Sequence, residues 1–167
     1  MVEQVPDSLE PAAPRLILVV DDESRMRRFI RMNMELEGYQ IIEAENGLAA
    51  TEQIRQHTPD LVIMDVMMPE MDGFETLKLL REISTVPVIL LTVKSDEDDK
   101  IQGLSLGADD YITKPFSPRE LVTRVTAVLR RAEWPAPPPR TILRVNDRVS
   151  PDLKQHQVIV NDERIDL

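Results

Sequence analysis

The chain has 167 residues, of which 42% are hydrophobic, 4% aromatic and 30% charged, and it contains no cysteine. This length allows one full domain and a smaller appendage. The lack of cysteine excludes disulfide bonds, thiolate zinc sites and cysteine catalysis, and it fits a reducing cytoplasm, where we expect the protein to act. Thirty acidic and twenty basic residues give a net charge of −10, so the chain as a whole repels a polyanion such as DNA. No apolar run approaches the ~18–20 residues that span a bilayer, and we expect no membrane partner.

Composition divides the chain into four segments. Residues 1–14 carry three acids, no base and no periodic pattern, which predicts a disordered tail without the positive start of a secretory signal. Four prolines crowd between positions 135 and 139 and indicate a stiff, extended linker over about 132–140. The main domain is therefore expected at 15–131. Residues 141–167 alternate as short strands that are too few to bury a core of their own.

Short apolar runs alternate with amphipathic stretches of helical length throughout the main domain. We expect strands at Leu16–Val20, Gln40–Ala44, Leu61–Met64, Val86–Leu91 and Tyr111–Thr113. We expect helices at Ser24–Leu36, Gly47–Gln56, Phe74–Ile83, Glu97–Leu106 and Ser117–Arg131. Runs that are apolar on both faces suit strands covered by helices on both sides. Five such units predict a doubly wound α/β fold with a parallel sheet.

Polar residues stand at the carboxyl ends of these strands, where ligands bind in such sheets. Asp21 and Asp22 follow the first run, Asp65 the third and Thr92 the fourth, while Lys114 ends the fifth. Three neighbouring carboxylates repel one another and need a cation, and hard oxygen ligands with room for water favour Mg²⁺, which Mn²⁺ can replace. Taken singly, such an aspartate or threonine is often a helix cap and such a lysine a surface charge. Their coincidence at one edge favours a phosphoryl site.

Three stretches of the sequence carry a family resemblance. They are Val19–Glu23, Leu61–Gly73 and Gly107–Phe116, and they resemble the receiver domain of bacterial two-component response regulators. The sequence around Lys114 is most similar to the OmpR/PhoB subfamily. The resemblance covers residues 15–131 and implies a flavodoxin-like, five-stranded parallel sheet in the order 2-1-3-4-5.

The C-terminal strands resemble the first, antiparallel strands of the winged-helix effector domain of that subfamily. We expect them at Thr141–Val145, Arg148–Ser150, Gln157–Val160 and Arg164–Leu167, with a turn at 161–162. The chain stops before a helix-turn-helix. The parent protein is therefore expected to be a transcription factor that binds DNA only through the missing part.

The resemblance also implies roles for the residues at the strand ends. Asp65 would accept a phosphoryl group from a sensor histidine kinase. Asp22 and Asp65 would bind Mg²⁺ directly, Asp21 mainly through water, and Met67 through its backbone carbonyl. Lys114, after which the family has a cis peptide bond to proline, would pair with the phosphoryl oxygens, and Thr92 would donate a hydrogen bond to one of them. The protein would thus be a phosphoacceptor with its own autophosphorylation and autodephosphorylation chemistry rather than an enzyme.

A switch and a dimer follow from the same resemblance. Thr92 would move toward the new phosphoryl group, and the ring of Tyr111 would turn inward and change the surface of the fourth helix, fifth strand and fifth helix. In the subfamily that surface forms a homodimer. The corresponding charged pairs are Lys100 with Glu120, Asp110 with Arg124, and Asp109 with Arg131.

Two other classes of protein also use an aspartate at the end of a strand, and each makes a different prediction. An aspartyl-phosphate phosphohydrolase needs a second acid two residues after its nucleophile, where this chain has Met67. A pure interaction module with a structural cation site predicts no covalent labelling by a phosphodonor.

Overall fold

The computed structural model describes residues 13–93, 97–133, 149–152, 157–160 and 163–166. The chain divides into two compact units, Met1–Trp134 and Pro135–Leu167. Most of the tail predicted at 1–14 and most of the linker predicted at 132–140 lie outside the described residues. Within the described ranges, no helix is both long and apolar enough to cross a lipid bilayer.

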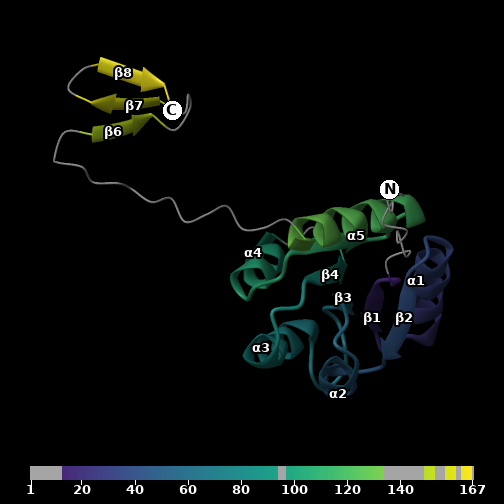
Figure 1. Cartoon of the computed structure of the whole chain (residues 1–167). Helices are drawn as coiled ribbons and strands as arrows, with labels where there is room; N and C mark the ends of the chain where they lie inside the picture. Colours follow the sequence, from purple (N-terminus) through teal and green to yellow (C-terminus); the bar gives the residue numbers. More distant parts are fainter. Residues whose placement is uncertain (1–12, 94–96, 134–148, 153–156, 161–162, 167) are drawn as a thin grey trace, which may run out of the picture. The chain divides into compact units, whose positions relative to one another are not determined.

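The first unit is a parallel sheet whose strands are joined by helices (Figure 1). Its strands are β1 (Leu16–Val20), β2 (Gln40–Ala44), β3 (Leu61–Asp65), β4 (Val88–Val93) and β5 (Asp110–Lys114). Its helices are α1 (Ser24–Leu36), α2 (Gly47–His57), α3 (Gly73–Ile83), α4 (Glu97–Ser105) and α5 (Pro118–Glu133). The strands pair in parallel in the order β2-β1-β3-β4-β5, which confirms the expected flavodoxin-like sheet.

Helices cover both faces of this sheet, and each face has its own core. Because successive residues of a strand point to opposite faces, Ile17 and Val19 of β1 pack with α1 and α5, whereas Leu18 and Val20 pack with α2 and α3. Figure 1 shows α1 and α5 on one side and α2 and α3 on the other. Burial on both faces explains why the strands read as unbroken apolar runs.

The strand and helix boundaries agree closely with the sequence patterns, and the largest difference lies in β4. The run Val86–Leu91 predicts a strand, but β4 spans Val88–Val93. Pro87 has no N–H to donate to the sheet, so the strand begins after it. At the other end, β4 stays paired with β5 as far as Val93 opposite Lys114.

The loop after β3 folds back tightly against the end of that strand. The N–H of Gly73 donates to the carbonyl of Val66 at 2.9 Å, and the Asp72 side chain caps α3 by accepting from the N–H of Glu75 at 2.8 Å. A Cβ atom at position 73 would lie 2.5 Å from the carbonyl oxygen of Asp65, so only glycine fits there without a shift of the backbone.

The second unit contains a three-stranded antiparallel sheet in the order β6-β7-β8. Its strands are β6 (Val149–Asp152), β7 (Gln157–Val160) and β8 (Glu163–Asp166). The strand predicted at Gln157–Val160 is found with the same bounds. Those predicted at Arg148–Ser150 and Arg164–Leu167 each differ by one or two residues at their ends. The predicted strand Thr141–Val145 and the turn at 161–162 lie outside the described residues.

Candidate functional site

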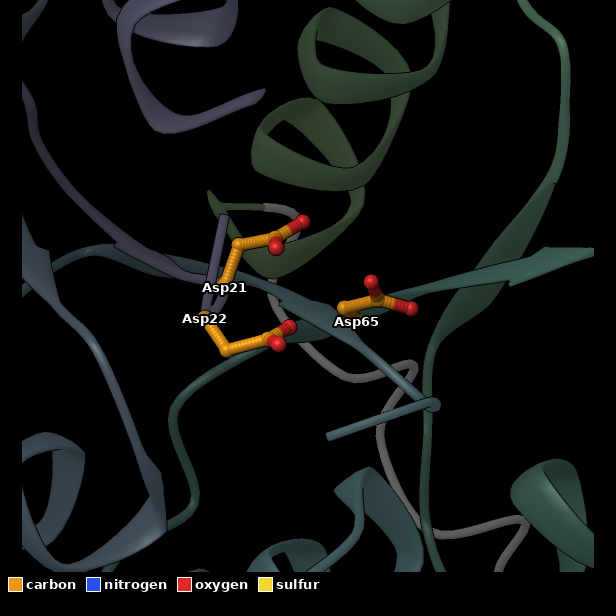
Figure 2. Close-up of side chains that lie close together, drawn as sticks. All are labelled: Asp21, Asp22 and Asp65. Atoms are coloured by element: carbon orange, nitrogen blue, oxygen red, sulfur yellow. The ribbon is translucent and has the colours of Figure 1, made fainter. Parts of the chain in front are cut away.

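Three aspartates meet at the carboxyl end of the sheet. Asp21 and Asp22 directly follow β1, and Asp65 is the last residue of the neighbouring strand β3, whose Met64 is paired with Val20. One carboxylate oxygen of each lies within 4.8 Å of the others (Figure 2). Asp21 and Asp65 are buried, whereas Asp22 is exposed to solvent. The fold thus brings together the three carboxylates that the sequence placed at the ends of two strands.

Lys114 supplies a cation to this group of acids. It is the last residue of β5, and its Nζ lies 2.7 Å from Oδ2 of Asp65 and 3.9 Å from Oδ2 of Asp21. The peptide bond between Lys114 and Pro115 is cis, as expected from the resemblance. A single ammonium group balances only part of the charge of three carboxylates.

Thr92 lies beside the acids, but within β4 and not after it. The predicted end of this strand at Leu91 was wrong, because the pairing of β4 with β5 continues past Thr92 to Val93. Leu91 is paired with Asp65, and Thr92 is the next residue along the strand. The Thr92 side chain is buried, and its Oγ1 has no hydrogen-bond partner among the described residues.

Asp21 is held in the site by backbone contacts. Its N–H donates to the carbonyl of Ala44, and its Oδ1 accepts from the N–H of Glu23 at 2.9 Å. Its Oδ2 is buried without a hydrogen-bond partner in the described part of the chain. The pKa of Asp21 is raised from 3.8 to about 6: burial is the largest cause and the negative charge of Asp65 adds to it, while the Glu23 N–H and Lys114 act in the opposite direction.

The donor set fits a hard divalent cation. The buried Oδ2 of Asp21 has no hydrogen-bond partner in the described part of the chain and the pKa of its carboxyl group is raised, which indicates that the ionised site is short of positive charge. Carboxylate oxygens are ligands that Mg²⁺ prefers, and the exposed Asp22 leaves one side of the cluster open to water. These three acids therefore form a cluster that could bind a metal ion.

The backbone after β3 fixes the Asp65 carboxylate. The N–H of Met67 donates to its Oδ1 at 3.1 Å, and Lys114 holds Oδ2. The Met67 side chain is 68% exposed, so it does not fill the site. A metal-binding role for the Met67 carbonyl stays a prediction.

Tyr111 contacts a residue of the predicted dimer surface. Its ring is half-buried against the core shared by α2 and α3, and Nζ of Lys100 lies 4.6 Å from the ring centroid. This distance is within the range of a cation–π interaction. The predicted switch residue and the predicted interface lysine are therefore in contact within one chain.

The other predicted interface residues lie on β5, the loop before it and α5, and four of them form side-chain contacts within one chain. Oδ2 of Asp110 lies 3.3 Å from Nη1 of Arg124 and 3.9 Å from Nη2 of Arg131. Oδ2 of Asp109 accepts from the N–H of Val88 at 2.8 Å and from Arg81 at 3.3 Å. Glu120 is half-buried on the first turn of α5. Pairing of these residues between two chains remains a prediction.

Arg27 is a neighbour of the site that the sequence analysis did not single out. It lies on α1, donates to the backbone carbonyl of Asp21, and binds Glu43 on β2. The available signal in the sequence was Glu43, an acid that directly follows the apolar pair of β2 and is only half-exposed. A contact to a backbone carbonyl leaves no pattern of its own in a sequence.

The chain matches known proteins over the first unit and beyond. The model of the response regulator receiver domain matches residues 17–126. The alkaline phosphatase synthesis transcriptional regulatory protein PhoP of Bacillus subtilis is 43% identical over 150 residues, which are 89% of this chain and 59% of that protein. The transcriptional regulatory protein ResD of the same organism is 44% identical over 155 residues, or 90% and 65% of the two chains. The chain thus spans about three-fifths of the length of these relatives.

Solved structures give the same result for the fold. A putative response regulator from Chloroflexus aurantiacus is 37% identical, with a TM-score of 0.68 over 71% of this chain and all of the other. The receiver domain of the Francisella response regulator 1452 is 38% identical, with a TM-score of 0.67 over 71% of this chain and 99% of the other. PhoP and ResD are regulators of the OmpR/PhoB type, which confirms the resemblance at the level of the subfamily. This chain therefore belongs to the two-component response regulators and contains their receiver domain.

Proposed function

We propose that Asp65 accepts a phosphoryl group from a phosphohistidine of a sensor histidine kinase. One observation carries the proposal: the buried Asp65 carboxylate lies 2.7 Å from the Lys114 ammonium and beside two further acids. In the transfer, an oxygen of Asp65 forms a bond to phosphorus. The bond from phosphorus to the kinase nitrogen breaks, and the nitrogen leaves with its electron pair.

The residues around Asp65 orient it for this reaction. A carboxylate is a weak nucleophile, so the rate depends on position and on neutralisation of the phosphoryl charge. The Met67 N–H and Lys114 hold the two oxygens of Asp65 and fix the plane of the carboxylate. After transfer, Lys114 is close enough to pair with the phosphoryl oxygens.

Thr92 is the second donor for the phosphoryl group. A buried hydroxyl without a hydrogen-bond partner costs free energy, so Oγ1 of Thr92 favours a state in which an acceptor arrives beside it. A phosphoryl oxygen on Asp65 supplies that acceptor. This need is a physical reason for Thr92 to move on phosphorylation.

Asp21, Asp22, Asp65 and the Met67 carbonyl would hold the metal ion, which we propose to be Mg²⁺ or, in its place, Mn²⁺. When bound, the ion neutralises negative charge on the phosphoryl oxygens. The fit rests on hard oxygen donors and on Oδ2 of Asp21, which is buried without a hydrogen-bond partner among the described residues.

The output that we propose is a homodimer formed through α4, β5 and α5. Phosphorylation adds up to two negative charges at Asp65, and Thr92 and Tyr111 respond to them. Lys100 with Glu120, Asp110 with Arg124, and Asp109 with Arg131 would then pair between the two chains. Each exposed pair contributes about 0–1 kcal/mol, so the pairs specify the partner more than they supply affinity.

We also propose that the parent protein regulates transcription. Its relatives PhoP and ResD are named as transcriptional regulators. The three-stranded sheet β6-β7-β8 would then belong to the opening strands of a winged-helix effector domain, and DNA binding would need the rest of that domain.

Phosphodonor labelling tests the acceptor assignment. We expect acetyl phosphate with Mg²⁺ to add the mass of one phosphoryl group to the wild type and none to Asp65→Asn, with EDTA preventing the addition. Asp110→Asn is the matched control, because it removes a carboxylate from the first residue of β5, at the opposite end of the strand from Lys114; it is expected to label fully. Equal labelling of Asp65→Asn would refute the assignment, and no labelling of the wild type would favour a structural cation module.

A further inference from the structure

Arg27 joins the acidic site to the neighbouring strand. Its Nη1 donates to the backbone carbonyl of Asp21 at 2.7 Å, and its Nε lies 3.2 Å from Oε1 of Glu43 on β2. The side chain is 17% exposed, so both contacts are largely shielded from water. The planar guanidinium group serves both partners at once, which an ammonium group does less well.

The carbonyl that Arg27 holds belongs to the peptide group between Asp21 and Asp22. The N–H of Asp21 is already bound to Ala44 and its Oδ1 to the N–H of Glu23. The Arg27 contact fixes the remaining polar group of the backbone at this residue. The same planar peptide group contains the N and Cα atoms of Asp22, so holding its carbonyl also restricts where the Asp22 side chain begins. Arg27 therefore acts on the orientation of the second acid as well as the first.

Glu43 balances the charge of Arg27. A lone guanidinium beside the acids would repel a divalent cation and offset the benefit of its position. Glu43 carries the opposite charge and is bound by Arg27 and, one helical turn further along α1, by Arg31. Arg31 also donates to the carbonyl of Ile41 and to Glu35, and no contact between Arg31 and Asp21 is found.

We propose that Arg27 is a positioning residue for the divalent cation: through the Asp21 carbonyl it holds Asp21 and Asp22 in the orientation that binds the ion. This inference rests on the proposed metal-dependent function and deepens it. Outer contacts that orient metal ligands typically change metal affinity by about 10–100-fold when removed. Arg27 acts through a backbone carbonyl, so the lower end of that range is expected.

The test is the Mg²⁺ dissociation constant of the full, unphosphorylated chain, measured by isothermal titration calorimetry. We expect Arg27→Gln to weaken Mg²⁺ binding about tenfold. Arg31→Gln is the matched control, because it removes the same charge from the same helix and the same partner, Glu43. It is expected to change the affinity by less than about twofold. Thermal unfolding in EDTA monitors the fold of each variant.

If Arg27→Gln does not fold, two conservative substitutions, Arg27→Lys and Arg31→Lys, provide the same comparison. Arg27→Lys retains the charge but cannot serve Asp21 and Glu43 with one planar group, so we expect weaker Mg²⁺ binding than in Arg31→Lys. Affinity in Arg27→Gln equal to or above that of the wild type would overturn the inference. So would an equal loss in the Arg27 and Arg31 variants. If the wild type itself binds no Mg²⁺, the proposed metal site fails and this inference fails with it. If the wild type binds Mg²⁺ and the Arg27 variants show no specific loss, only this inference fails.

Discussion

The carboxyl edge of the sheet and the face formed by α4, β5 and α5 differ in how firmly the fold of a single chain holds their charged side chains. At the edge, Asp65 and Lys114 come from different strands and meet at 2.7 Å, largely out of contact with water. On the face, Asp110 is shared by Arg124 and Arg131, both of which are exposed. Burial makes the position of each charge at the edge energetically important. On the exposed face, long side chains can change partners at little cost.

Removing one lysine from each region should give the clearest contrast. Lys114→Met leaves Asp65 buried without its counter-charge, and we expect the metal-free protein to lose about 3 kcal/mol of unfolding free energy. Lys100→Met removes an ammonium group from the Tyr111 ring and should cost less than about 1 kcal/mol. Urea unfolding in EDTA measures both. Equal losses would contradict the contrast between the two regions.

Overpacking behind the site should have the next largest effect. Gly73→Ala places a Cβ against the backbone carbonyl of Asp65, which cannot move alone, and we expect a loss of about 2 kcal/mol and slower labelling by acetyl phosphate. A Cβ atom at Gly103 on α4 would lie 2.7 Å from the end of the Leu90 side chain, which can move, and at ordinary contact distance from Phe74, so the loss in Gly103→Ala should be smaller. Thermal unfolding and labelling rates measure the two variants, and a larger loss in Gly103→Ala would argue against this packing.

Removing a carboxylate from the edge should stabilise the protein when no metal is present. The folded-state pKa of Asp21 is raised to about 6, so the folded state holds this proton more tightly than the unfolded state does. The resulting stability is complete below the unfolded pKa of 3.8 and is lost as the pH rises through about 6. We therefore expect Asp21→Asn in EDTA to gain about 1–2 kcal/mol at about pH 8 and little at about pH 4. The same gain at both values would contradict the burial of an ionised Asp21.

A substitution on the exposed face should have the smallest effect on the unfolding free energy of the single chain and a larger effect on dimerisation. Arg124→Ala should change unfolding free energy by less than about 1 kcal/mol, because its bond to Asp110 is exposed. If the proposed dimer forms, the same variant should weaken dimerisation after acetyl phosphate treatment, as measured by analytical ultracentrifugation. Arg130→Ala on the same helix is the control. Equal weakening by both variants would remove Arg124 from the predicted interface.

The sequence predicted most of the fold because the strands are buried on both faces. The runs at β1 and β2 have the observed bounds, and an acid, Asp21 or Glu45, directly follows each of them. The start of β4 was misplaced at Val86, because an apolar pattern does not record the missing N–H of Pro87. The order of the strands came from the family resemblance, since alternation alone does not specify which strands are neighbours.

The site was predictable to the extent that it depends on strand ends. Asp21, Asp65 and Lys114 could be brought together because parallel strands end at one edge. The contact of Arg27 with the Asp21 carbonyl could not, because any donor in reach can bind a backbone carbonyl. The same holds for Asp109, whose Oδ2 accepts from a backbone N–H on β4.

The central claim, that the buried Asp65 is the phosphoryl acceptor, is tested most directly by chemical trapping. Borohydride reduces an acyl phosphate of aspartate to homoserine. After treatment with acetyl phosphate and Mg²⁺, reduction and peptide mass mapping, we predict homoserine at position 65 and unmodified aspartate at positions 21 and 22. Homoserine at another aspartate, with position 65 unchanged in a fully phosphorylated sample, would contradict the account.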